Sequence, residues 1–298
     1  MSIDGYKKTE IKEMNLRALE YISAVLMQNP RLIESGDVRA VMECGVSEEE
    51  AVVELLCASL GLDARRNPEH EMLERKYFRP SVRRLDAQTF RQNPYYQQIS
   101  FPDAQSGNWS MTHLSYAPYE LFVRDDLLCM EDGREIPQLG YFGEPFFYPA
   151  VLENGREWMT ITPNEIATMQ LEIDAAKGHV AVMGLGLGYY AFMVSQKETV
   201  SRVTVIEKDR DAIALFKKHI LTQFPNREKV RVVCADAFEY VQTSLASRKA
   251  DYAFVDLWHD VSDGVPMYIR MKALEWFAPE TKFMYWIETS IQAFLRNL

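Results

Sequence analysis

Three alternating glycines constrain this chain more than any other feature. The run reads Gly184-Leu185-Gly186-Leu187-Gly188 and directly follows a short apolar stretch, residues 180–183. A helical pattern over residues 189–195 comes next. Glycines at such a junction permit a tight turn and let a ligand approach the backbone, while the start of the helix supplies free N–H groups. A strand, a glycine turn and a helix in this order predict a site for a nucleotide-type ligand.

Short apolar runs alternate with helical patterns through the C-terminal part of the chain. We expect strands at residues 180–183, 203–206, 230–233, 252–255 and 283–287. Helical patterns separate them, the last covering residues 267–277. Such alternation favours right-handed crossovers and a parallel sheet with helices on both faces. We therefore predict an α/β, Rossmann-like fold in which a ligand lies beyond the carboxyl ends of the strands.

Two acidic residues follow the second and third expected strands and suit an adenosine. Glu207 is placed to accept hydrogen bonds from both ribose hydroxyls. Its alternative role is a surface carboxylate paired with Lys208. Asp236, followed by Ala237, is placed to accept from the adenine amino group, and the neighbouring backbone completes that contact. The alternative for Asp236 is a helix cap, and the two roles are compatible.

An acidic and aromatic cluster follows the fourth expected strand. It reads Asp256-Leu257-Trp258-His259-Asp260. Carboxylates, an imidazole and an indole at the mouth of a parallel sheet are typical of a site for a cationic or amine substrate. We expect Asp256 or His259 to orient or deprotonate the acceptor, and we include Asp260 among the candidate catalytic residues. The alternative is a capping and turn cluster before Gly264-Val265-Pro266.

Other nucleotide ligands fit the glycine turn less well. A nicotinamide fingerprint needs a small residue five positions after the first glycine, where this chain has Tyr189. A bulky ring at that position disfavours a dinucleotide. No Gly-Lys-Ser or Gly-Lys-Thr triplet is present, which disfavours an ATP-binding phosphate loop.

Together these residues resemble the class I S-adenosylmethionine-dependent methyltransferases. The glycine run is similar to the glycine motif of that family, Glu207 to its ribose-binding residue and Asp236 to its adenine-binding residue, over about residues 163–290. The resemblance implies the class I methyltransferase type of fold, S-adenosyl-L-methionine as cofactor and in-line methyl transfer to a small-molecule or protein acceptor. The expected cofactor contacts are Gly184, Leu185, Gly186, Gly188, Glu207, Lys208, Asp236, Ala237 and Asp256.

A weaker resemblance connects the chain to the spermidine synthase branch of the same superfamily. Residues 152–157 and 164–165 resemble its hairpin and the start of its first helix. The chain departs from that branch at Ile166, Ala167 and Met169, and the cluster at 256–260 replaces a motif of the form Asp-Ser-x-Asp-Pro. Aminopropyl transfer is therefore the first alternative to methyl transfer. A non-catalytic module that binds S-adenosylmethionine is the second.

The remainder of the chain divides into two further parts by pattern. Residues 1–105 look helical, with a capping box at Ser47 and Glu50, and we expect a helical N-terminal domain. Residues 106–162 carry many Gly and Pro between short aromatic runs, which predicts a β-rich connecting segment. A second capping box, at Thr162 and Glu165, opens the Rossmann-like domain at residues 163–298. The family's last β-hairpin has no obvious source here, so either the sheet is shortened or mid-chain strands complete it.

Bulk composition limits the partners that we expect. The net charge of −10 disfavours nucleic acid, because Lys and Arg dominate affinity for phosphate backbones. Four separated cysteines without a paired His set predict no metal site. The polar start and the absence of a long apolar run argue against a signal peptide and a membrane span. We expect a cytoplasmic protein, and a homo-oligomer stays open.

Overall fold

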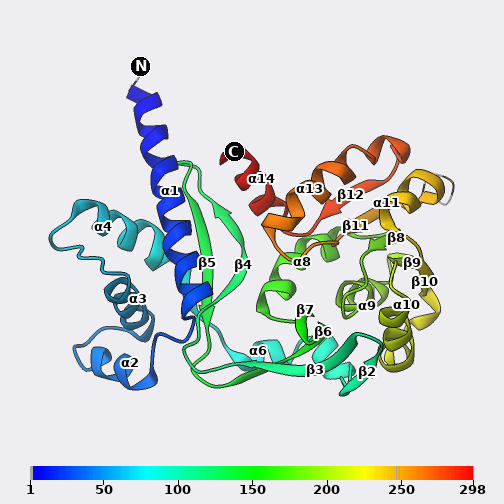
Figure 1. Cartoon of the computed structure of the whole chain (residues 1–298), viewed down its shortest axis with the longest axis horizontal. Coiled ribbons are helices and arrows are strands. Elements are labelled where there is room, and N and C mark those ends of the chain that lie inside the picture. The colour runs from blue at the N-terminus through cyan, green and yellow to red at the C-terminus, as the bar shows by residue number, and fades with distance from the viewer. Residues whose placement is uncertain (1–2, 246, 248, 298) are drawn as a thin grey trace. The chain divides into compact units, whose positions relative to one another are not determined.

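The computed structural model describes residues 3–245, 247 and 249–297 (Figure 1). They form two compact units, each continued by a second stretch of chain. Unit 1 comprises Met1–Gln88 and Ser115–Phe147, and unit 2 comprises Thr89–Leu114 and Tyr148–Leu298. The domain boundaries expected from the sequence, at residues 105 and 162, differ from the boundaries of these units and remain a prediction.

Unit 1 combines helices with a small sheet. The sheet has the strand order β1-β5-β4, in which β1 (Val82–Arg84) is parallel to β5 (Glu135–Tyr141) and β4 (Phe122–Cys129) is antiparallel to it. The helical elements are α1 (Ile3–Gln28), α2 (Ser35–Met42), α3 (Glu48–Ser59), α4 (Pro68–Leu73), η1 (Glu74–Phe78) and α5 (Arg79–Ser81), and α6 (Ala87–Arg91) crosses the boundary between the units. Their apolar faces form a separate core that includes Val52, Leu56, Phe78 and Tyr141.

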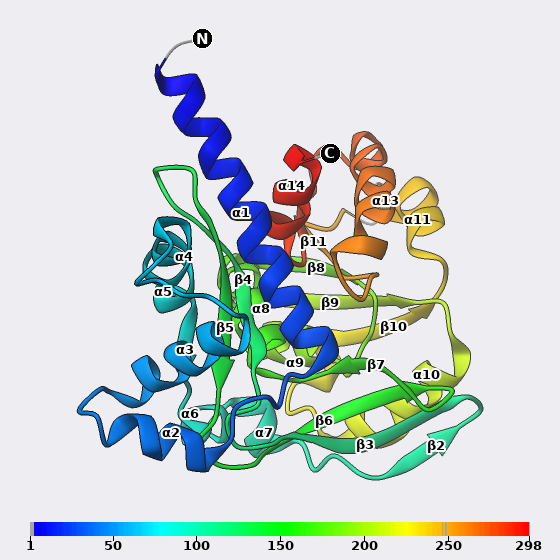
Figure 2. The same cartoon turned by 60° about the vertical axis from the view of Figure 1, so that its left-hand side comes forward.

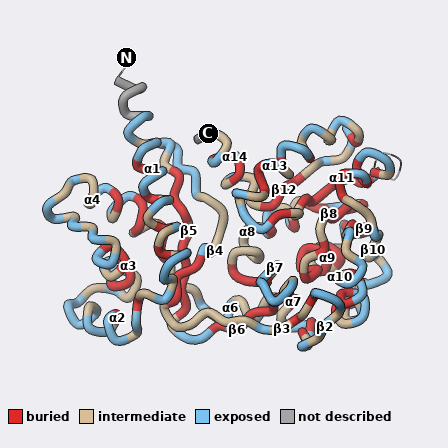
Figure 3. The backbone as a smooth tube through the Cα atoms, in the orientation of Figure 1, coloured by how far each residue is buried: buried red, intermediate tan, exposed pale blue. Residues whose placement is uncertain are grey.

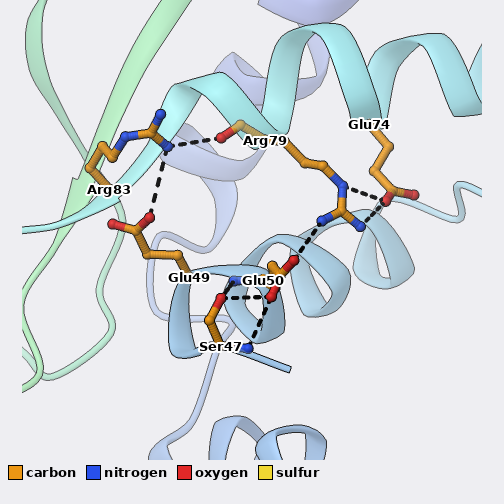
Figure 4. Close-up of polar contacts among 6 residues, drawn as sticks. All are labelled: Ser47, Glu49, Glu50, Glu74, Arg79 and Arg83. Carbon is orange, nitrogen blue, oxygen red and sulfur yellow. Dashed lines mark hydrogen bonds and ion pairs between the residues drawn. The ribbon is translucent and has the colours of Figure 1, made fainter. Parts of the chain in front are cut away.

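A polar network lies at the start of α3 (Figure 4). The predicted capping box is confirmed, because Glu50 accepts from the Ser47 backbone N–H at 3.0 Å and the Glu50 N–H donates to the Ser47 hydroxyl. The Arg79 guanidinium joins this box to η1, lying 2.7 Å from Glu74 and 3.5 Å from Glu50. Because the groups are partly exposed, each ion pair contributes at most about 1 kcal/mol, and the network mainly orients α3.

Unit 2 is built around the predicted parallel sheet. Five strands lie in the order β10-β9-β8-β11-β12, and every neighbouring pair is parallel. The strands are β8 (Gly178–Met183), β9 (Val200–Glu207), β10 (Val230–Cys234), β11 (Tyr252–Val255) and β12 (Lys282–Tyr285). The chain steps from β8 outward to β10 and then returns to the other side of β8. The carboxyl ends of β8 and β11 thus flank the topological switch point, where ligands bind in such sheets.

Helices connect these strands, as the sequence pattern predicted. They are α8 (Pro163–Ala175), α9 (Tyr189–Ser195), α10 (Arg210–Leu215), α11 (Ala237–Tyr240), α13 (Val261–Lys272) and α14 (Glu288–Asn297), with shorter helical turns at η2 (Phe216–Ile220), η3 (Leu221–Gln223), η4 (Arg227–Lys229), η5 (Val241–Leu245) and η6 (Glu275–Phe277). Buried residues concentrate in β8, β9 and α9 (Figure 3). None of the described helices combines the length and apolar character that crossing a bilayer needs.

Two element boundaries differ from the prediction. The segment expected to be helical at 267–277 contains the end of α13 and η6, but α13 begins at Val261, because Asp260 and Asp263 form a capping box that starts it earlier and Pro266 is accommodated within it. The strand expected to reach residue 287 ends at Tyr285, since the chain turns into α14 at Glu288. The capping box at Thr162 and Glu165 is confirmed.

The mid-chain strands do not complete the parallel sheet. They form a separate sheet with the order β2-β3-β6-β7, whose strands lie side by side in Figure 2. Its strands are β2 (Ala104–Ser106), β3 (Trp109–Tyr116), β6 (Phe146–Glu153) and β7 (Arg156–Thr160), and α7 (Pro94–Gln98) precedes them. A tight turn joins β6 to β7, with positive φ at Asn154 (53°) and Gly155 (77°). Within the described residues, the parallel sheet therefore has five strands and no terminal hairpin.

Candidate functional site

The glycine turn after β8 packs closely on the end of β11. Gly184 has φ = 98°, and a Cβ at this residue would lie 1.9 Å from the backbone oxygen of Asp256. The Gly184 N–H donates to the Ile206 carbonyl at 3.0 Å, and the Asp256 N–H donates to the Met183 carbonyl at 2.9 Å. Glycine is required at position 184 because only it combines this φ with so close an approach. The turn thereby brings the ends of β8, β9 and β11 together.

The other two glycines serve different contacts. A Cβ on Gly186 would collide with the Met159 sulfur, at 1.8 Å, so β7 lies directly on the turn. Gly188 caps α9 with φ = 77°, and a Cβ there would lie 2.3 Å from the Phe216 ring. Gly188 does not line the pocket described below. The close packing of the Phe216 ring explains why this position is a glycine.

A pocket of about 340 Å³ opens at the carboxyl ends of β8, β9, β10 and β11. Most of the candidate residues from sequence lie on its wall. These are Gly184, Leu185, Gly186, Glu207, Lys208, Asp236, Ala237, Asp256 and His259. Gly188 and Asp260 are the two that the structure does not bring to this wall. The cavity lies where the switch-point argument places a ligand, and the binding roles of these residues remain predictions.

Glu207, at the end of β9, is held by two backbone groups. Its Oε2 accepts from the Leu185 N–H at 3.3 Å, and its Oε1 accepts from the Asp209 N–H at 2.8 Å. Within the described residues, Glu207 makes no ion pair with Lys208. The carboxylate is thus preorganised at the pocket wall, where each oxygen retains a further lone pair for a ligand hydroxyl.

Asp236 both caps a helix and lines the pocket. Its Oδ1 accepts from the Glu239 N–H at 3.0 Å at the start of α11. Ala235, just before it, donates its N–H to the Glu207 carbonyl at 3.0 Å, which ties the ends of β9 and β10 together. Asp236 therefore caps α11 through Oδ1, and its other carboxylate oxygen can accept a hydrogen bond from a ligand.

Asp256, at the end of β11, lines the pocket and is partly exposed. Burial raises its pKa to about 8, and the nearby Glu165 carboxylate adds to the rise. At neutral pH the group is therefore mostly protonated unless a cation is near. A buried carboxyl with a shifted pKa in a pocket is typical of a functional site.

Sequence reasoning did not assign a site role to three acidic residues on the same wall. Glu165, in α8, accepts hydrogen bonds from the Thr162 N–H at 2.9 Å and the Thr160 hydroxyl at 3.0 Å, and burial raises its pKa. Glu157, on β7, is exposed at the mouth; partial burial and then Glu165 raise its pKa. Glu153, on β6, also lines the wall. The positions of Glu153 and Glu157 depend on how the hairpin folds over the glycine turn, which no local pattern reports, whereas the capping box that holds Glu165 was predicted without a role in the site.

The 256–260 cluster divides between the pocket and the helix. The His259 ring lines the pocket and packs edge-on against Trp158, with centroids 4.5 Å apart. Asp260 instead caps α13, accepting from the Ser262 N–H and hydroxyl at 2.6 Å each. The hydroxyl contact holds the pKa of Asp260 below its usual value. The capping alternative thus describes Asp260, and the pocket contains Asp256 and His259.

Tyr189 joins the glycine turn to the segment that contains α7. Its side chain is buried, its hydroxyl accepts from the Asn93 side-chain N–H at 3.0 Å, and its ring packs on Tyr95. The Tyr95 hydroxyl donates to the Leu187 carbonyl at 2.7 Å. A dinucleotide fingerprint has a small residue at this position. Here the position is occupied by the Tyr189 ring, which packs against α7.

The fold and this pocket define a Rossmann-like domain of the class I methyltransferase type. Residues 159–271 match the model of the Spermine/spermidine synthase domain, which is less than half of the 298-residue chain. No curated protein matches the chain. The likeness is therefore to the Spermine/spermidine synthase domain, over a part of the chain that includes most residues of the pocket.

Solved structures give only distant likenesses. The spermidine synthase from Thermotoga maritima is 15% identical, with a TM-score of 0.35, over 50% of this chain and 55% of that chain. A spermidine synthase in complex with the transition state analogue AdoDATO is 17% identical, with a TM-score of 0.28, over 35% and 38%. A conserved hypothetical protein from Streptococcus pyogenes is 16% identical, with a TM-score of 0.29, over 36% and 65%. This chain thus spans about half the length of the T. maritima enzyme.

The expectation of a methyltransferase was wrong. The match of residues 159–271 to the Spermine/spermidine synthase domain supports aminopropyl transfer, the first alternative, over methyl transfer. The glycine turn and strand-end carboxylates are common to both activities, because both use an adenosyl sulfonium. These motifs therefore do not distinguish the two activities.

Proposed function

We propose that this chain transfers an aminopropyl group from decarboxylated S-adenosylmethionine to an amine. The observation that carries the proposal is the wall of carboxyl groups around Asp256, within a region that matches the Spermine/spermidine synthase domain. A sulfonium and an alkylammonium both carry positive charge, so acidic side chains stabilise them in a pocket with little water.

The nucleoside half of the substrate is assigned to the ends of β9 and β10, where Glu207 and Asp236 line the pocket. Glu207 would accept from the ribose hydroxyls and Asp236 from the adenine amino group. Gly184 and Gly186 also line the pocket, so the glycine turn would lie beside the ligand. These assignments keep the ligand contacts expected from sequence and change the group that the sulfur carries.

Charge favours the decarboxylated compound over S-adenosylmethionine itself. The methionine carboxylate of S-adenosylmethionine would need a cationic partner near the acidic wall. Among the described residues that line the pocket, Lys208 is the only Lys or Arg, and it follows Glu207 on the ribose side. A carboxylate beside Asp256 and Glu165 would meet like charges, which is unfavourable at low local dielectric.

The residues suit displacement at carbon. The acceptor nitrogen forms a bond to the propyl carbon next to sulfur, the carbon–sulfur bond breaks, and its electron pair stays on sulfur as a neutral thioether. The nitrogen loses a proton in the process. Asp256 would hold the acceptor ammonium and take that proton before the nitrogen attacks.

A product assay tests the proposal. The full chain is incubated with decarboxylated S-adenosylmethionine and a panel of diamines and monoamines, and mass spectrometry measures aminopropylated amine and 5′-methylthioadenosine. Equal amounts of both products are expected, with loss of both in Asp256→Asn. Tight binding of the nucleoside without any product from the panel would contradict the proposal and favour the non-catalytic binding module.

A further inference from the structure

The pocket continues past Asp256 toward the last strand of the parallel sheet. In the strand order, β11 lies between β8, which leads into the glycine turn, and β12. The Trp286 N–H donates to the Val255 carbonyl at 3.0 Å, so the first residue after β12 lies beside the residue that precedes Asp256. Trp286 also lines the pocket. An amine held at Asp256, with the sulfonium on the side of the glycine turn, therefore has Trp286 on its other side.

Two tryptophans give this end of the pocket a fixed apolar surface. Trp258 and Trp286 line the pocket and are only 5% and 7% exposed. The Trp286 Nε1–H donates to the Thr168 hydroxyl at 2.8 Å. The Trp258 ring lies parallel to the Tyr285 ring, with centroids 6.4 Å apart, and its N–H edge packs on Gly264, where a Cβ would lie 3.2 Å from Nε1. Neither indole can turn without breaking these contacts.

The charges behind this surface are satisfied within the protein. The Lys272 ammonium lies 3.1 Å from Glu275 and 3.2 Å from Glu288. The Tyr285 hydroxyl donates to Glu275 and the Tyr268 hydroxyl to Glu288, each at 2.7 Å. None of these five residues lines the pocket. The network therefore ties α13, η6, β12 and α14 together without presenting a charge to a ligand.

The charged groups on the wall near this end are few and are held by the chain. Among the described residues that α13 and the chain after β12 bring to the pocket, Asp263 alone is charged. Its carboxylate accepts from the N–H groups of His259 and Asp260 at 3.0–3.2 Å. Glu165, on α8, is engaged by its own capping box. A second ammonium placed beyond Asp256 would thus lose its water and meet apolar side chains, which is unfavourable.

We propose that the acceptor is a primary amine with a single ammonium, and that the rest of it is apolar and lies against Trp258, Met267 and Trp286. Met267 comes from α13 and lines the pocket with a flexible side chain that adapts to an alkyl group. The inference rests on the proposed function, because it names the class of amine that receives the aminopropyl group.

A second ammonium is the competing occupant of this end. Aromatic faces attract cations, and Glu153 and Glu157 on the hairpin would pair with an amine that extends along the other wall. A diamine would then be the better acceptor. Because the two occupants differ only in the charge at the far end, a monoamine and a diamine of equal length distinguish them.

The test compares 1-aminopentane with 1,5-diaminopentane as acceptors, using the full chain and decarboxylated S-adenosylmethionine. Mass spectrometry gives initial rates of aminopropylated product. The wild-type kcat/KM should be at least about tenfold higher for the monoamine, and should rise roughly two- to fourfold per methylene from 1-aminopropane to 1-aminopentane. Met267→Glu places a carboxylate at the apolar end and should shift the ratio of the two values toward the diamine by at least about tenfold.

Ile269→Glu is the matched control, because it makes the same change on the same helix at a residue that is 51% exposed. It should leave the ratio unchanged. Binding of 5′-methylthioadenosine shows that each variant is folded. If Met267→Glu does not fold, Met267→Ala replaces it, and this variant should lower kcat/KM for 1-aminopentane more than for 1-aminopropane.

Faster or equal reaction of the diamine in the wild type would overturn the inference and leave the proposed function standing. So would an unchanged ratio in folded Met267→Glu, or equal losses for both monoamines in Met267→Ala. If no amine reacts, calorimetry of the two five-carbon amines with protein saturated with 5′-methylthioadenosine separates the claims. Tighter binding of 1-aminopentane would then overturn only the proposed function, and any other result would overturn both.

Discussion

The Leu185 N–H donates a hydrogen bond to Oε2 of Glu207 across 3.3 Å. This contact joins the glycine turn after β8 to the carboxylate at the end of β9. Glu207, which we propose binds the ribose, is therefore held in position by the glycine turn. We propose that this turn lies beside the sulfonium end of the same ligand. Loss of either partner should affect both halves of the pocket.

Glu207→Ala should weaken 5′-methylthioadenosine by about 1.5–3 kcal/mol, the scale of hydrogen bonds to a charged group. The carboxylate would no longer accept from the ligand or restrain the Leu185 N–H. Calorimetric titration measures the change. Glu228→Ala, which removes an exposed carboxylate, should leave the affinity unchanged, and unchanged affinity in Glu207→Ala would remove Glu207 from the site.

Asp256→Asn should reduce turnover roughly 10²-fold or more, the usual effect of losing a positioned acid–base group. The side chain keeps its size, so the affinity for 5′-methylthioadenosine should stay within a few fold. Single-turnover measurements with decarboxylated S-adenosylmethionine separate the two quantities. A variant that reacts at the wild-type rate would show that Asp256 only supports the turn, and His259 would become the next candidate.

The stability of the protein should depend on pH through Asp256. Because its pKa in the folded protein, about 8, lies above the ordinary value of 3.8, the folded state holds the extra proton between these values. Its stabilising contribution is present below about pH 4 and is lost as the pH rises through about 8. Asn does not titrate, so Asp256→Asn lacks this pH-dependent loss of stability. The melting temperature of the variant minus that of the wild type should therefore increase by at least about 2 °C between pH 5 and pH 9. Asp174→Asn, which removes an exposed carboxylate, should show no such trend, and the same flat result for Asp256→Asn would contradict the assignment.

Gly184→Ala should destabilise unit 2 far more than Gly155→Ala. Both glycines have positive φ, which costs an alanine about 1–2 kcal/mol. Only at Gly184 would the new Cβ meet backbone, at the Asp256 carbonyl, whereas nothing lies within 4 Å of the Cβ position at Gly155. The additional overpacking is worth about 1–3 kcal/mol. Thermal unfolding compares the two variants, and equal losses would mean that the turn does not pack on β11 as described.

NADH should not compete with 5′-methylthioadenosine for the pocket. The buried Tyr189 ring occupies the place where a dinucleotide site keeps a small residue for close packing of helix on strand. Competition calorimetry measures whether NADH lowers the apparent affinity of the protein for 5′-methylthioadenosine. A micromolar dissociation constant for NADH would contradict the proposed ligand class.

Local patterns predicted the parallel sheet and much of the site. The glycine turn, the strand-end residues Glu207 and Asp236, and the capping boxes at Ser47 and Thr162 depend on residues close in the chain. Periodicity and capping report such neighbours directly. The prediction of methyl transfer was wrong because the same local motifs serve any adenosyl sulfonium, whichever of its groups is transferred.

The sequence by itself thus determined a Rossmann-like sheet and the residues at its switch point. Only the tertiary structure decided which other residues line the pocket beside Asp256. It brings Glu165 from α8 and Glu157 from the hairpin to the pocket that Asp256 also lines. These residues lie far apart in the chain, and their meeting depends on strand order and on how the β6–β7 hairpin lies over Gly186. The charge of the site is consequently a property of the folded chain that no single motif encodes.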